Sequence, residues 1–120
     1  MRILILEDDP NRHVRFRRNL IGAEITIVDQ AQDAIELLKT KEWDLLCLDH
    51  DLGGKIHVDS SEPNTGYAVA KWLEENPKFQ PKEIILHSLN PVGRENMKKC
   101  LPNAKEIPCA WDLIRIKSST

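Results

Sequence analysis

The chain has 120 residues, of which 41% are hydrophobic and 30% charged, and its net charge is −2. This size and composition predict a single domain over residues 1–120, with one hydrophobic core. The small net charge excludes strong binding of duplex nucleic acid by bulk electrostatics, although it is compatible with a local site for a nucleotide or an RNA end.

Strand-like and helix-like segments alternate from the N-terminus. Residues 2–6 form an apolar run typical of a buried parallel strand. Residues 11–20 then predict a helix, with Pro10 in its first turn. Residues 24–28 are alternating and β-branched, which predicts a second strand.

The middle of the chain continues this alternation. Asp29 is expected to cap a second helix, because Gln32 follows at the spacing of a capping box. Residues 44–48 are almost wholly apolar and predict the third strand. The loop that follows, 49–64, is long for a connection between a strand and a helix, and such loops are often functional.

The second half predicts a helix, a strand, a helix and a weak strand, over residues 69–76, 83–86, 91–100 and 104–107. Asn90 is expected to cap the second of these helices. Residues 111–117 fit either a last short helix or an extended segment. Five strands that alternate with helices predict an α/β fold, a doubly wound parallel sheet within three α/β/α layers.

The N-terminal apolar run is too short for a signal peptide or a membrane span. The three cysteines, odd in number and without metal-type spacing, do not indicate a disulfide framework, and Cys47 is expected to be a buried thiol. We therefore expect a cytoplasmic protein that makes no contact with a membrane.

Polar side chains follow three of the predicted strands, where ligands of such sheets bind: Glu7, Asp8 and Asp9, then Asp49, His50 and Asp51, then His87, Ser88 and Asn90. Carboxylates held together repel unless they share a cation or some are protonated. We predict that Glu7, Asp8 and Asp49 hold a divalent metal and that Asp51 either joins them or orients His50. The alternative is that the acids only end strands and cap helices, as we expect of Asp9.

Three of these segments resemble the receiver domains of response regulators: residues 3–9, 43–49 and 84–88. The resemblance implies a flavodoxin-like strand order, a metal held by Glu7 and Asp8, and a phosphoryl group accepted by Asp49. Two features depart from it. No lysine precedes Pro108, where such receivers place one, and residues 50–54 differ from the usual segment after the phosphoacceptor.

The departures resemble a divergent branch, the cyclic-phosphate processing receiver domains, through residues 48–54, 65–67 and 87–90, with Gly93, Arg94 and Met97 beyond. This resemblance implies a metal-assisted phosphoesterase, a phosphoric ester hydrolase of the cyclic phosphodiesterase type, acting on a cyclic phosphate of an RNA end or a nucleotide. The metal would be Mg²⁺, with Mn²⁺ and Zn²⁺ as alternatives.

In that hypothesis Asp49, His50 and His87 are catalytic, because histidines titrate near neutrality and suit proton transfer. Alternatively, the two histidines could ligate a transition metal, and equally each could only hydrogen-bond the acidic cluster. Ser88, Asn90 and Arg94 would bind phosphate at a helix start, with a plain helix cap and a surface charge as the alternatives for Asn90 and Arg94.

Two other functions are consistent with the same residues. One is a stand-alone receiver phosphorylated on Asp49, and the other is a degenerate receiver that acts as an adaptor for a protein partner. The arginines of the first predicted helix, Arg12 among them, are interpreted as a solvated face. His57 and Asp59 are candidates for closing the long loop over a ligand.

Overall fold

The computed structural model describes residues 1–115 and contains one five-stranded parallel sheet. The strands are β1 (Arg2–Leu6), β2 (Glu24–Val28), β3 (Leu45–Leu48), β4 (Glu83–Leu86) and β5 (Lys105–Glu106). The helices are α1 (Pro10–Asn19), α2 (Ala31–Thr40), α3 (Gly66–Glu75), the 3₁₀ turn η1 (Pro77–Phe79), α4 (Pro91–Cys100) and α5 (Ala110–Leu113). The strand order β2-β1-β3-β4-β5 confirms the predicted doubly wound fold with flavodoxin-like order.

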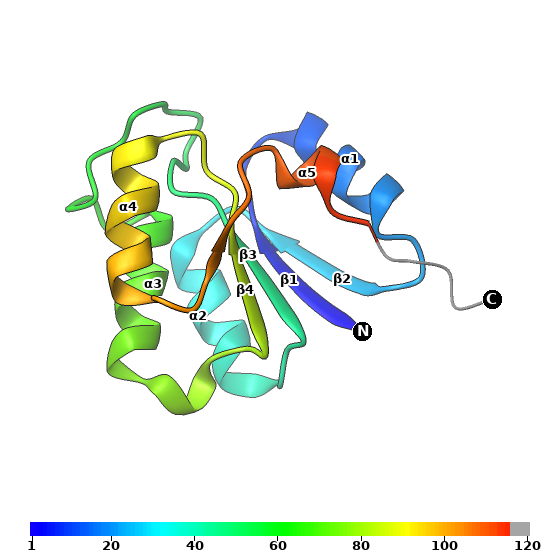
Figure 1. The fold of residues 1–120 in the computed structure, drawn as a ribbon, viewed down its shortest axis with the longest axis horizontal. Coiled ribbons are helices and arrows are strands. Elements are labelled where there is room, and N and C mark those ends of the chain that lie inside the picture. The colour runs from blue at the N-terminus through cyan, green and yellow to red at the C-terminus, as the bar shows by residue number, and fades with distance from the viewer. Residues whose placement is uncertain (116–120) are drawn as a thin grey trace.

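Helices cover both faces of the sheet, with α1 and α5 on one face and α2, α3 and α4 on the other (Figure 1). Successive strand residues point to opposite faces, so β1 feeds both layers. Ile3 and Ile5 pack with Phe16 of α1, whereas Leu4 and Leu6 pack against the three-helix layer. A sheet buried on both faces explains the unbroken apolar runs of the central strands.

Most predicted elements are confirmed, and the differences lie at their ends. β3 begins at Leu45 rather than at 44, and the Asp44 carboxylate just before it accepts the backbone N–H of Arg2 at 2.7 Å. β5 has only two residues, and α5 ends at Leu113. Residues 116 and 117 of the predicted last helix lie outside the described residues. No helix within 1–115 is long and apolar enough to cross a membrane.

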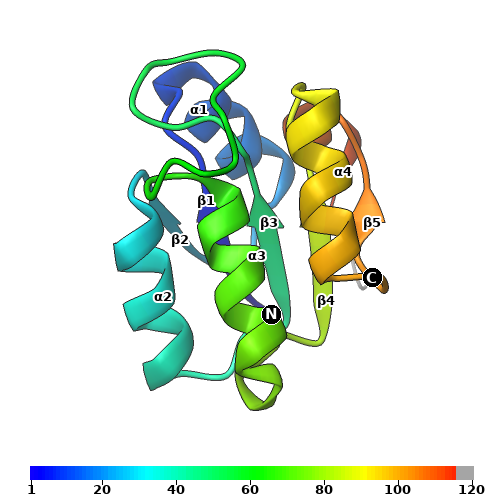
Figure 2. The same cartoon turned by 90° about the vertical axis from the view of Figure 1, so that its left-hand side faces the viewer.

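Residues 49–65, called the long loop below, connect β3 to α3 and pass over the carboxyl ends of the strands, beside the start of α1 (Figure 2). The loop also supplies a helix cap. The expectation that Asp29 caps α2 is wrong, since the residue before the helix is Gln30 and its side chain makes no capping bond. Instead Asn64 Oδ1 accepts the N–H of Ala31 at 2.9 Å.

Replacing Asn64 with alanine should lower the free energy of unfolding by about 1 kcal/mol, because it leaves a first-turn N–H of α2 without its acceptor. Asp29→Ala is the matched control and should cost less, because the Asp29 side chain makes no capping bond. Urea denaturation followed by circular dichroism measures both changes. Equal losses in the two variants would contradict the assignment of the cap to Asn64.

Candidate functional site

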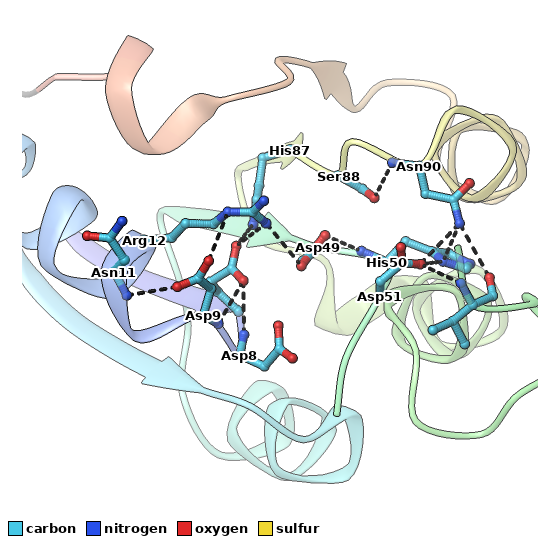
Figure 3. Close-up of polar contacts among 12 residues, drawn as sticks. Asp8, Asp9, Asn11, Arg12, Asp49, His50, Asp51, His87, Ser88 and Asn90 are labelled. Carbon is cyan, nitrogen blue, oxygen red and sulfur yellow. Dashed lines mark hydrogen bonds and ion pairs between the residues drawn. The ribbon is translucent and has the colours of Figure 1, made fainter. Parts of the chain in front are cut away.

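A pocket of about 470 Å³ opens where the carboxyl ends of β1, β3 and β4 meet the long loop. Its walls combine acids with an arginine and polar groups at the start of α4: Asp8, Asp9, Asp49, Asp51, Arg12, Ser88 and Asn90 (Figure 3). Residues 54–57 of the long loop close another side. The strand ends that the sequence predicts as a site therefore meet around one cavity.

Behind the pocket, Glu7, Asp49 and His87 form a buried group whose ligand atoms lie within 4.8 Å of one another. Glu7 and His87 are fully buried and Asp49 is only 3% exposed. His87 Nε2 lies 3.1 Å from Glu7 Oε1, and Glu7 Oε2 accepts the N–H groups of Asp8 and Asp9 at 3.0 and 3.1 Å. Among the described residues, this group is the one placed to hold a metal ion.

Asp49 belongs to the buried group and also lines the pocket. Its Oδ1 accepts the N–H of His50 at 2.9 Å. Burial, and then the nearby charge of Glu7, raise the pKa of Asp49 from 3.8 to about 8. These two effects outweigh the hydrogen bond from His50 and the charge of Arg12, which both lower the pKa. The metal-free carboxyl is therefore largely protonated at neutral pH, and a cation that binds it displaces a proton.

The Glu7–His87 pair is an ionised acid beside a neutral ring. Burial raises the pKa of Glu7, but the hydrogen bond from His87, with help from the N–H of Asp9 and the charge of Arg12, holds it below its usual value. Burial lowers the pKa of His87 itself. We take His87 as neutral with Nε2–H donating, because its buried Nδ1 has no hydrogen-bond partner and a protonated ring would strand an N–H there.

Arg12 reaches the acids from α1. Its Nη1 lies 3.5 Å from Glu7 Oε1 and 3.8 Å from Asp49 Oδ2, and its Nε lies 3.6 Å from Asp9 Oδ2. The guanidinium carbon is 4.1 Å from the ring centroid of Trp111 on α5. The guanidinium is thus clamped between the carboxylates and an aromatic face.

His50 and Asp51 fasten the long loop. His50 is fully buried and does not line the pocket; its Nδ1 lies 2.8 Å from Asp51 Oδ1 and its Nε2 lies 2.8 Å from Ser60 Oγ. Asp51 accepts two backbone N–H groups of the long loop at 2.7 and 3.1 Å. Burial opposes its charge, but hydrogen bonds from His50 and Asn90 lower its pKa. The structure does not bring Asp51 into the buried metal-capable group.

Of the predicted phosphate ligands, Ser88 and Asn90 line the pocket and Arg94 does not. Asn90 Oδ1 accepts the N–H of Gly93 at 3.0 Å, which confirms Asn90 as the cap of α4, and its Nδ2 donates to Asp51 Oδ1 at 3.0 Å. Arg94 Nη1 instead donates to the carbonyl oxygen of Ser88 at 2.8 Å. Arg94 therefore holds the segment that presents the Ser88 hydroxyl.

The two other loop candidates are separated. His57 lines the pocket, in a left-handed conformation with φ of 52°, and is exposed. Asp59 lies outside the pocket lining, and its carboxylate accepts the N–H of Ser61 at 2.8 Å in a local turn. Only His57 is therefore placed to meet a ligand in the pocket.

Sequence reasoning missed Arg12 and Ser60. The interpretation of Arg12 as part of a solvated face is wrong, since its side chain is only 23% exposed and contacts the acids. The available signal was its position one helical turn before Phe16, which is fully buried and marks the inward side of α1. Ser60 gave no signal, because its contact with His50 depends on the path of the long loop.

The doubly wound sheet, the buried acids after β1 and β3 and the serine after β4 together define a receiver domain. The family model described as the cyclic-phosphate processing receiver domain matches residues 2–103. The chain therefore belongs to that family, as its sequence resemblance predicts. No curated protein sequence matches the chain.

Solved response regulators share the fold. The Mn²⁺-bound form of response regulator Rcp1 is 17% identical with a TM-score of 0.67, and the match covers 89% of this chain and 79% of that one. The phosphorylated cyanobacterial phytochrome response regulator RcpA is 18% identical with a TM-score of 0.70, over 89% and 79%. TrrA from Thermotoga maritima, in complex with Mg²⁺-BeF, is 24% identical with a TM-score of 0.64, over 98% and 87%.

These matches contradict the expected phosphoesterase, a metal-assisted hydrolase of a cyclic phosphate. The similar structures are response-regulator and signal receiver domains, and they favour the alternative function, a receiver. The site gives the physical reason. His50 and His87 were expected to exchange protons with a leaving group, yet both are fully buried and neither lines the pocket.

Proposed function

We propose that this receiver domain accepts a phosphoryl group on Asp49, assisted by a divalent cation that Glu7, Asp8 and Asp49 hold. The observation that carries the proposal is the position of Asp49. Its carboxylate belongs to the buried group with Glu7 and also lines the pocket, so a cation and a phosphoryl group can meet at one side chain.

The donor set fits a hard cation. Glu7 and Asp49 each have a carboxylate oxygen in the buried group, close enough together to bind one cation. Asp8 lines the adjoining pocket wall, where its Oδ2 accepts the N–H of Gly54 at 2.6 Å. Mg²⁺ commonly binds one or two carboxylates, waters and a phosphate oxygen, and Mn²⁺ suits the same ligands. Such a cation would polarise the phosphoryl oxygens. The Mn²⁺ and Mg²⁺-BeF forms of the similar response regulators support this choice.

The pocket supplies what the transferred group needs. An ionised Asp49 oxygen attacks phosphorus, a new P–O bond forms, and the donor's P–O bond breaks as its leaving group takes the electron pair. The Ser88 hydroxyl and the N-terminal end of α4 face the same cavity and can donate hydrogen bonds to phosphoryl oxygens. The partners of the domain would be a small phosphodonor and a protein that reads the phosphorylated state.

Incubation with acetyl phosphate and Mg²⁺ should add one phosphoryl group to the wild-type protein, seen by intact mass, and Asp49→Asn should abolish the addition because it removes the nucleophile. Asp59→Asn is the matched control. It removes a loop acid outside the pocket and should be modified like the wild type. Calorimetry with Mg²⁺ and beryllofluoride provides a second readout that needs no covalent transfer.

A wild-type protein that takes up neither phosphoryl group nor beryllofluoride would contradict the proposal. Modification of Asp49→Asn at the wild-type rate would contradict it as well, because the acceptor would then be another residue. In the first of these cases the remaining function among those consistent with the sequence is an adaptor that binds a protein partner.

A further inference from the structure

We propose that Arg12 is the cationic residue that grips the phosphoryl group on Asp49, and that Trp111 positions it for this task. The inference rests on the proposed function and names a residue that the sequence predictions leave outside the site. Its basis is the position of the Arg12 guanidinium, which lies beside the acids (Figure 3) and 4.1 Å from the ring centroid of Trp111 on α5.

A phosphoryl group on Asp49 requires positive charge beside that of the metal. The oxygens of that phosphoryl group carry about two negative charges at neutral pH, and the carboxylate of Asp8 already lines the same pocket. Arg12 lines the pocket with Asp49, and its Nη1 lies 3.8 Å from the Asp49 Oδ2 atom. A group bonded to that carboxylate and projecting into the pocket would therefore meet the guanidinium, whose planar fork suits phosphoryl oxygens.

The other cations do not share this placement. Lys55 lines the pocket but sits on the long loop as an exposed residue without an ion pair in the described part of the chain. Arg94 is outside the lining, with its guanidinium on the Ser88 carbonyl and on Glu106 at 3.5 Å. No lysine precedes Pro108. Arg12 is thus the positive side chain held against Asp49 before any ligand arrives.

Trp111 fixes the orientation of Arg12. The indole is 4% exposed, and it packs edge-on against the rings of Phe16 at 6.5 Å and His87 at 5.9 Å, so its own position is set by the core. A guanidinium over a desolvated indole face is held there by cation–π attraction. The stack also connects the pocket to α5, so a shift of Arg12 toward a phosphoryl group should change the environment of Trp111.

Arg12→Gln should slow phosphorylation by acetyl phosphate by about tenfold or more, the loss typical of a charge-assisted contact in the transition state. Its Mg²⁺ affinity should stay equal or rise, because Arg12 competes with the cation for Glu7 and Asp49. Arg12→Lys should recover part of the rate. Arg17→Gln is the matched control, since it removes an exposed charge from the same helix without an ion pair among residues 1–115.

Trp111 is tested as a positioning residue. Trp111→Phe keeps an aromatic face and should retain most of the phosphorylation rate, whereas Trp111→Leu should lose rate like Arg12→Gln with Mg²⁺ affinity intact. Trp111→Phe also identifies the Trp111 part of the emission spectrum. The Trp111 fluorescence of the metal-free wild type should differ from that of Arg12→Gln, because the substitution removes the guanidinium from the indole face. Thermal unfolding establishes that each variant is folded.

The outcomes separate the two proposals. A wild-type protein that is not modified at all overturns the proposed function and the role of Arg12 with it. A modified wild type with Arg12→Gln equally fast overturns the role of Arg12 alone. Loss of rate and of Mg²⁺ affinity in the same proportion also overturns it, because Arg12 would then act through the metal-binding acids.

Discussion

Asp49→Asn should stabilise the metal-free domain, by an amount that grows as the pH rises from about 4 to about 8. The pKa of Asp49 is raised from 3.8 to about 8 in the folded state, so over this range the folded protein holds a proton that the unfolded chain has lost. At this residue the unfolded state then binds fewer protons, so the contribution of Asp49 to the free energy of unfolding falls with pH until it levels above pH 8. Asparagine lacks this titration and keeps the Oδ1 acceptor for the His50 N–H.

The expected gap at pH 8 is about 2 kcal/mol or more, because each pKa unit corresponds to about 1.4 kcal/mol and water entering the pocket removes part of the total. Urea denaturation of both proteins with EDTA, at several pH values, measures it. Saturating Mg²⁺ should stabilise the wild type by about 2.7 kcal/mol at a hundred times its dissociation constant, and Asp49→Asn far less. A gap that does not change with pH, or equal stabilisation of both by Mg²⁺, would contradict this account of Asp49.

The fold was largely predictable because its signals are local and repeated. Apolar runs such as residues 2–6 identify strands that are buried on both faces, and alternation with helices leaves few topologies. The helix caps show the same difference between local and long-range signals. Asp9 and Asn90 cap the helices that follow them, as predicted, whereas the α2 cap comes from Asn64, which lies 33 residues away from Ala31.

The site was predictable in place but only partly in composition. Strand ends gather Glu7, Asp49 and His87 because the topology of a parallel sheet requires it. What each side chain contacts is harder to predict. The path of the long loop directs Asp51 toward His50, whereas Arg12 meets the acids from the inward side of α1. The predicted roles of both histidines assumed access to a ligand, and burial removes that access.

Gly66→Ala should destabilise the domain by about 3 kcal/mol or more, and it should also impair phosphorylation of Asp49. A Cβ atom at Gly66 would lie 1.8 Å from the carbonyl oxygen of Asp49 and 3.0 Å from Met97 Sδ. The first contact is with the backbone, which no change of rotamer relieves, so α3 must withdraw from β3 or Asp49 must move. Withdrawal would also break the hydrogen bond of 3.1 Å from the Gly66 N–H to the His50 carbonyl.

Gly22→Ala is the comparison that isolates this contact. Gly22 has a φ of +95° and nothing within 4 Å of its added Cβ, so alanine there costs only the strain of a left-handed backbone, about 1–2 kcal/mol. Chemical denaturation should rank wild type, Gly22→Ala and Gly66→Ala in that order of decreasing stability. Where the variants remain folded, only Gly66→Ala should slow phosphorylation, because only that substitution displaces the carbonyl that places the Asp49 side chain. Equal stability of the two variants would mean that α3 and the end of β3 do not fit as closely as these distances require.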